Sequence, residues 1–241
     1  MARRGLVFAA LAAAVALVPA AFATPGGAGG LPASVSTYLL GPKLIRAEVA
    51  VKRNQTALDF LVDRGKLLKR FSAKSINLLE RDGTASTIPV SPFARVTLNG
   101  RPSGLRALRA GMQIAVAHQD GTAADAVYAS SARLAAPKLP PAVAATLLGN
   151  KLIRAEVFLK DTALHDYRLD RGRIKQVGTS TLVLHEPDGT DQSIDISPTA
   201  HVKVNGKPAS FAQLQIGMMA VVMRDHDNPA DQVFATGLKR R

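Results

Sequence analysis

Cysteine is absent from the 241 residues of this chain, and its absence excludes three kinds of chemistry. Without thiols there is no disulfide framework, no thiol nucleophile and no cysteine-based zinc site. The amino-terminal acceptor to which bacterial lipoproteins attach their lipid is missing as well. Stability must therefore come from ordinary hydrophobic cores.

Aromatic side chains are scarce too. Tryptophan is absent, and Phe, Tyr and Trp together make up 5% of the residues. The chain therefore has few of the aromatic residues on which sugars or the bases of single-stranded nucleic acid stack. The sequence also contains no Gly-x-Ser-x-Gly, no glycine-rich phosphate loop and no His-x-x-Glu metal helix. We predict a protein that is not an enzyme and that carries no cofactor.

The amino terminus has the pattern of a secretory signal. Arg3 and Arg4 precede an apolar run from Gly5 to Leu17, and the small-residue site Ala21-Phe22-Ala23 follows. The alternative is an uncleaved membrane anchor. No later segment approaches the roughly 20 apolar residues that cross a bilayer. If the signal is cleaved after Ala23, we expect a secreted, periplasmic or cell-envelope protein outside the cytoplasm.

One phrase occurs twice, as LLGPKLIRAEV at residues 39–49 and as LLGNKLIRAEV at residues 147–157. Matches continue in the same order through nearly the whole remaining chain, which indicates a tandem duplication. The alternative is that the two copies share one core and that the phrase marks their joint interface. The predicted divisions are a signal peptide (1–23), a flexible linker (24–30), a first β-barrel repeat (31–133), a linker (134–138) and a second β-barrel repeat (139–241).

Apolar residues within each copy mostly follow the period of two that is typical of β-strands. In the repeated phrase, Ile45, Ala47 and Val49 share one face while Arg46 and Glu48 share the other. Asp-Gly and Asn-Gly pairs, which accept positive φ, separate the strands. The later strands predicted in the first copy are 75–79, 87–90, 95–98, 113–117 and 126–130.

Short helical pieces interrupt the β pattern. LPASVSTYLLG and LPPAVAATLLG each place Pro near a helix start and Gly where the helix would stop. SGLRALRAGM and SFAQLQIGM each read as one helical turn that caps an open barrel end. The predicted fold is mainly β, with two tandem small β-barrel domains, OB-like or sandwich-like, and short capping helices.

The run from Arg171 to Met223 resembles a glycine-punctuated small β-barrel domain of unknown function that is common in exported bacterial proteins. The shared pattern is a Gly-x-Ile/Val strand, an Asp-Gly hairpin, a T-x-V-x-V-N-G-x-P segment and an L-x-x-G-x-x-V-x-V ending. The first copy fits from Gly65 to Val116. The resemblance implies a barrel and export, and it transfers no catalytic residue. The matching positions are Gly172, Ile174, Asp188-Gly189, Val202, Val204, Asn205-Gly206, Pro208, Leu214, Gly217 and Val221.

The histidines test for a duplicated active site, because such a site should leave duplicated catalytic residues. None of the five is matched in the other copy: His118 aligns with Arg224, for example, and His185 aligns with Leu79. The alternative is catalysis confined to the second copy.

A metal site is the other chemical alternative. Met218, Met219 and Met223 lie in one strand of the second copy, which also contains His185 and His201, and such soft ligands select Cu(I). Core filling by methionine is the favoured interpretation. The stretch RDHDNPADQ at residues 224–232 supplies oxygen ligands for Ca²⁺, but an ordinary hairpin loop is favoured there because the central Gly of an EF-hand is missing. We predict no metal.

Charge distinguishes the two copies. The chain has 31 Lys and Arg against 18 Asp and Glu, and the first copy carries a net +8 while the second carries +2. A positive field attracts polyanions, although a basic protein also gains solubility. The residues predicted to bind a polyanion or partner are Lys66, Lys69, Arg70, Lys74, Arg101, Arg106 and Arg109. The repeated pairs Arg46/Glu48 and Arg154/Glu156 are interpreted as structural, through an ion pair across strands or a contact between copies.

The sequence therefore predicts an exported, non-enzymatic binding or structural module of the cell envelope. Its first repeat would present a basic surface to an anionic polymer, a membrane surface or an acidic protein. We expect no genomic nucleic-acid role, because the protein is exported. The alternative is an extracytoplasmic copper-handling domain that uses Met and His of the second repeat.

Overall fold

The computed structural model describes residues 31–72 and 74–237, so the predicted signal peptide (1–23) and the linker at 24–30 lie outside the described residues. In the described part, 59% of residues lie in strands and 10% in helices, which confirms the mainly β class. No helix among these residues has both the length and the apolar composition to cross a membrane.

The two copies contain the same elements in the same order. The first copy consists of α1 (Ala33–Leu39), β1 (Leu44–Arg53), β2 (Thr56–Ser72), β3 (Ser75–Glu80), β4 (Ala85–Leu98), β5 (Arg101–Ser103), the 3₁₀ turn η1 (Leu105–Ala107), β6 (Gln113–Gln119) and β7 (Ala124–Ser130). The second consists of α2 (Pro141–Leu147), β8 (Leu152–Lys160), β9 (Leu164–Val177), β10 (Thr181–His185), β11 (Asp191–Val204), β12 (Lys207–Ala209), η2 (Phe211–Gln213), β13 (Met219–Asp225) and β14 (Ala230–Thr236).

Each copy closes a small β-barrel, as the fold prediction stated. In the first, strands pair in the order β2-β3-β4-β7-β6 and β6 returns to β2, with only β4 and β7 running parallel. The second copy repeats this circuit with β9-β10-β11-β14-β13. Each barrel encloses its own apolar core, around Leu78 and Val127 in the first and around Leu184 and Val233 in the second. Leu108 and Leu214, which follow the 3₁₀ turns, are buried in these cores as predicted.

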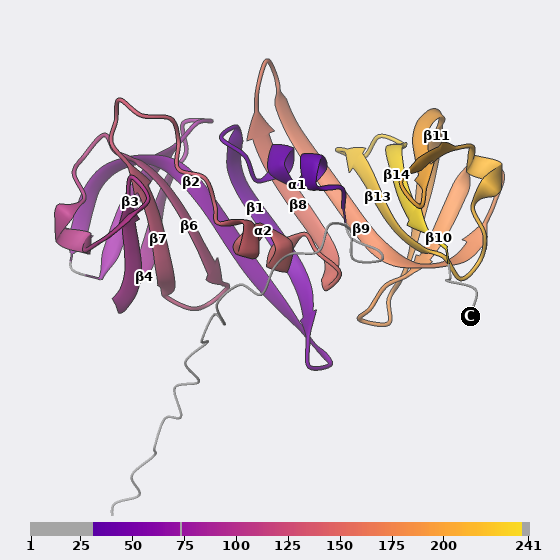
Figure 1. Cartoon of the computed structure of the whole chain (residues 1–241), viewed down its shortest axis with the longest axis horizontal. Helices are drawn as coiled ribbons and strands as arrows, with labels where there is room; N and C mark the ends of the chain where they lie inside the picture. The colour runs from indigo at the N-terminus through magenta and orange to yellow at the C-terminus, as the bar shows by residue number, and fades with distance from the viewer. Residues whose placement is uncertain (1–30, 73, 238–241) are drawn as a thin grey trace, which may run out of the picture.

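The repeated phrase forms the junction between the barrels. Its strands β1 and β8 pair antiparallel, and each also pairs with the next strand of its own copy, so one sheet runs through the molecule (Figure 1). Ala47 faces Val157 and Val49 faces Ala155. Since these are equivalent residues of the two copies, an approximate twofold axis passes through the pairing.

A third core covers one face of this central sheet. Helices α1 and α2 lie in front of β1 and β8 in Figure 1, and Leu39, Leu147, Val49 and Val157 all belong to one buried cluster. Each fully buried side chain of this kind contributes roughly 1.5–3 kcal/mol, whereas an exposed ion pair contributes roughly 0–1 kcal/mol. The copies are therefore joined by shared hydrophobic packing, while the division at residues 133 and 139 stays a prediction about independent folding.

Local turn chemistry agrees with the sequence. Asn99 and Gly100 have φ of 54° and 76°, and Asn205 and Gly206 have 53° and 78°, as expected for Asn-Gly hairpins. Two strands of the first copy are missing from the predicted strands. One is the three-residue strand β5. The other is β2, whose charged residues break the alternation because the strand passes from the central sheet into the barrel. Likewise β4 is one long strand where the sequence predicted two, at 87–90 and 95–98.

Candidate functional site

The repeated arginine connects the central sheet to a hairpin of each barrel. Arg46 Nη1 lies 2.6 Å from Glu80 Oε2 and 2.9 Å from Asp82 Oδ2, across the start of the β3–β4 turn. Its guanidinium also lies 4.9 Å from the ring centroid of Phe158 in the other copy. The glutamate side chain is only 1% exposed. Such a buried, charge-assisted contact holds two elements together and leaves Arg46 partly covered.

The second copy repeats this arrangement. Arg154 Nη2 lies 2.6 Å from Glu186 Oε2 and also contacts Asp188. Neither arginine pairs with the glutamate two residues later in the repeated phrase. Instead Glu48 and Glu156 face each other across the β1–β8 pairing, and Glu156 lies 3.4 Å from Arg168.

The buried glutamates differ between the copies in one hydrogen bond. The Ser86 hydroxyl donates to Glu80, whereas Gln192 occupies the corresponding position in the second barrel. There Glu186 Oε1 has no hydrogen-bond partner among the described residues. Burial raises the pKa of Glu186 to about 7, with Arg154 opposing the shift and Asp170 adding to it. The second barrel therefore contains an incompletely satisfied carboxyl group.

A second cation–carboxylate pair is also duplicated, but with different cations. His118 Nε2 lies 3.6 Å from Asp63, and Arg224 Nη1 lies 3.3 Å from the equivalent Asp170. The hydrogen bond to Asp63 raises the pKa of His118 above its ordinary value. The first of these pairs, His118 with Asp63, borders an open groove of about 440 Å³. Within the described part of the chain, the His118 ring nitrogens contact Asp63 and two backbone carbonyls, and no hydroxyl nucleophile.

The triplet Asp-Arg-Gly occurs in both copies, as Asp63-Arg64-Gly65 and Asp170-Arg171-Gly172, and marks the bend between sheet and barrel. Arg64 is 2% exposed and donates to the carbonyls of Pro137 at 2.7 Å and Leu40 at 3.4 Å. A Cβ on Gly65 would lie 2.5 Å from the carbonyl oxygen of Leu79. The triplet is structural, and its recurrence in both copies is the signal that singles it out.

The residues considered for metal binding are dispersed. Met218 packs at the edge of the second barrel's core, while Met223 belongs to the central core. The His185 ring contacts the Asp191 carboxylate 2.7 Å away, and His201 is exposed. No group of three or more His, Cys, Asp and Glu able to hold a metal is found among residues 31–72 and 74–237.

The predicted basic residues lie on the first barrel. Lys66, Lys74, Arg101, Arg106 and Arg109 are exposed, while the side chains of Lys69 and Arg70 lie outside the described part. The segment after η1 adjoins β2, because the backbone of Leu67 makes hydrogen bonds to Gly111 at 2.7 Å and Met112 at 2.8 Å. The segment that follows η1 and Arg109 therefore runs beside β2, while Arg101 lies on the β4–β5 hairpin.

Most of these cations are replaced by uncharged residues in the second barrel. Only Lys66 and Arg101 have charged counterparts, Arg173 and Lys207. The aligned strands and turns place Lys69, Arg70, Lys74, Arg106 and Arg109 opposite Gln176, Val177, Ser180, Ala212 and Gln215. The shared fold is therefore retained without these charges, so the barrel itself does not require them.

Some cations of the second barrel are paired with carboxylates. In the second barrel Lys175 pairs with Asp191, and Arg168 lies 2.5 Å from Asp227. Among the described side chains, no ion pair involves Lys66, Arg101 or Arg106 of the first barrel, and the same holds for Arg173, Lys203 and Lys207 of the second. The barrels therefore differ in the number of exposed cations that carboxylates compensate.

Neither a protein-family model nor a curated protein matches this sequence.

Proposed function

We propose that this chain is an exported, non-enzymatic binding module whose first barrel presents a basic surface to an anionic component of the cell envelope. The observation that carries the proposal is the loss of five of the seven cations at equivalent positions of the second barrel. Because both barrels have the same circuit of strands, the fold does not require these charges, and an interaction with a partner would account for them.

Electrostatics favours an anionic partner of this kind. Exposed cations without neighbouring acids create a positive field that reaches roughly 8–10 Å at physiological salt. In the second barrel carboxylates compensate part of the positive charge, as Asp191 does for Lys175 and Asp227 for Arg168, and that copy carries a net +2 against +8 for the first. The first barrel is thus the part of the molecule to which a polyanion is drawn.

Export and family relationship belong to the same proposal. The signal-like residues 1–23 support a location outside the cytoplasm, and the strand and turn pattern supports descent from the glycine-punctuated barrel domain that the second copy resembles. The occupied contacts of His118 support a role without catalysis.

The proposal is tested with residues 24–241 and a soluble polyanion, heparin. A variant with Lys74→Ser, Arg106→Ala and Arg109→Gln receives the residues of the second barrel. It should bind heparin at least tenfold more weakly, because three cationic contacts to sulfate groups are lost. The slope of log affinity against log salt concentration should fall as well. The matched control removes three exposed lysines from the second copy (K151Q, K203Q and K207Q). Equal losses in the two variants would contradict the proposal.

A further inference from the structure

One apolar side chain projects from the first barrel without packing against it. Phe93 is 91% exposed, the highest value among the large hydrophobic residues that the structure describes. It lies where the parallel pairing of β4 with β7 is interrupted, between Val90 and Arg95, and its backbone N–H donates to the Ser91 hydroxyl at 3.2 Å. The local backbone therefore displays Phe93 at the surface.

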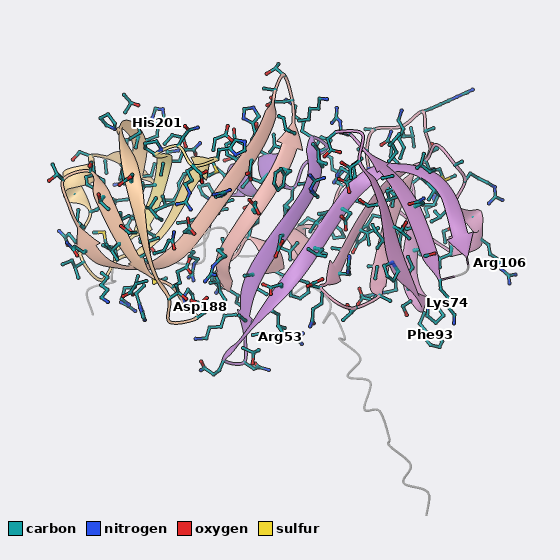
Figure 2. The ribbon with its side chains drawn as sticks, turned by 180° about the vertical axis from the view of Figure 1, so that it is seen from behind. Arg53, Lys74, Phe93, Arg106, Asp188 and His201 are labelled. Carbon is teal, nitrogen blue, oxygen red and sulfur yellow. The ribbon has the colours of Figure 1, made fainter. Side chains whose placement is uncertain are left out.

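Basic residues lie around this phenylalanine. The carbonyl of Lys74 accepts a hydrogen bond from Val90 N at 2.7 Å, so the β2–β3 hairpin borders the segment that carries Phe93. Arg95 follows two residues later and is exposed. Figure 2 shows Lys74, Phe93 and Arg106 together at the outer end of the first barrel. An exposed apolar side chain with cations on the neighbouring segments is an arrangement with which peripheral proteins engage anionic lipid surfaces.

The second barrel has the same backbone without either feature. Ile196 N donates to Ser180 O at 2.7 Å, as Val90 does to Lys74, and Thr199 stands where the first barrel has Phe93. The aromatic ring and its neighbouring lysine are thus both absent from the equivalent place. Since the backbone forms equally well with Ser and Thr, packing does not account for the pair.

We propose that the outer end of the first barrel docks on an anionic lipid bilayer, with Phe93 entering the interface and Lys74, Arg95 and Arg106 beside the phosphates. This inference rests on the proposed function and names its partner as a lipid surface. A soluble polymer would satisfy the cations, but it offers no apolar phase for the ring. The bilayer satisfies both parts of the patch.

The chain has no tryptophan, so one substitution makes a specific reporter. Phe93→Trp in residues 24–241 should show a blue-shifted emission with vesicles that contain phosphatidylglycerol, and no shift with phosphatidylcholine vesicles alone. Ile216→Trp is the matched control, because Ile216 is 70% exposed but belongs to the second barrel. Its emission should not shift. A blue shift in the control and none at Phe93 would overturn the proposal.

Vesicle affinity supplies the second measurement. Phe93→Thr installs the residue of the second barrel, which preserves the fold, and should weaken binding to phosphatidylglycerol vesicles roughly tenfold while leaving heparin binding unchanged. If the wild-type chain binds heparin but not vesicles, or if Phe93→Thr binds vesicles as tightly as the wild type, the bilayer inference is wrong and the proposed function stands. If the wild-type chain binds neither heparin nor vesicles, the bilayer inference and the proposed function both fail.

Discussion

Glu48 and Glu156 lie directly opposite each other in the antiparallel pairing of β1 with β8. They are the same residue of the two copies, so the approximate twofold axis passes between them. The repeated phrase is therefore complementary to itself: Ala47 of one copy faces the valine of the other, and Val49 faces the alanine. This explains why the phrase is retained more closely than the rest of the copies.

Self-complementarity predicts the behaviour of an isolated copy. Residues 31–133 alone would leave the edge of β1 open, and an open apolar edge pairs with another chain. Because β1 can face itself with the same alanine–valine pairs, this fragment should fold and form an antiparallel dimer. Analytical ultracentrifugation and circular dichroism check this. A folded, monomeric fragment would show that the central pairing adds little, and an unfolded one would show that the copies are not separate folding units.

The facing glutamates predict a stabilising substitution. Like charges directly opposite on neighbouring strands are unfavourable, while an opposite-charge pair contributes roughly 0.2–1 kcal/mol. Glu48→Lys should therefore raise the free energy of unfolding by a few tenths of a kcal/mol to about 1 kcal/mol. Chemical denaturation measures the change. The effect should shrink with added salt, and a salt-independent change would point to another cause.

Gly65 tests the bend between the central sheet and the first barrel. A Cβ there would lie 2.5 Å from Leu79 O and 2.9 Å from Leu79 C, and a backbone neighbour cannot give way cheaply. Gly65→Ala should lower the stability by roughly 1–3 kcal/mol. Gly104 is the matched control, since nothing lies within 4 Å of its Cβ position. Equal thermal shifts for the two variants would refute the close approach.

The buried carboxyl of Glu186 predicts a pH dependence. Its pKa rises from 4.5 to about 7 in the folded protein, chiefly through burial. Between these values the folded state holds the proton that the unfolded state releases, so the free energy of unfolding should fall as pH rises from about 4.5 to about 7. Glu186→Gln should flatten this part of the stability profile, as measured by denaturation at a series of pH values.

A reciprocal substitution separates this carboxyl from other titrating groups. Gln192→Ser supplies the hydroxyl that Ser86 gives to Glu80 in the first barrel. A hydrogen bond to the ionised carboxyl favours that form and should move the pKa of Glu186 down, which shifts the loss of stability to lower pH. An unchanged profile in both variants would exclude Glu186 as its source.

Local features of the fold were predictable from the sequence, and its long-range partners were not. The alternation of Ile45, Ala47 and Val49 predicts a strand with one buried face, and all three are buried. Asn-Gly pairs predict their turns because positive φ is a property of those residues. Arg46, however, finds Glu80 34 positions away, a contact that no local spacing encodes. Strand β2 was not predicted because it buries a charged residue, Arg64. The carbonyl groups that accept its hydrogen bonds belong to distant segments, which the local sequence does not reveal.

The candidate site was predictable to a similar degree. The charge difference between the copies is a property of composition, so the basic residues could be named from the sequence alone. Their exposure depends on the barrel, and the structure bears it out for Lys66, Lys74 and Arg106. The exposed ring of Phe93 was missed, since an aromatic residue after Ser-Pro is compatible with a strand that packs inward.

Lysine acetylation in the presence and absence of a polyanion tests the central claim most directly, because it reports which barrel is covered. With heparin bound to residues 24–241, an amine-reactive label should modify Lys66, Lys69 and Lys74 several-fold more slowly, while Lys151, Lys203 and Lys207 should react at unchanged rates. High salt should remove the protection, since it releases the polyanion. Equal protection of both sets, or protection confined to the second, would contradict the claim that the first barrel is the binding face.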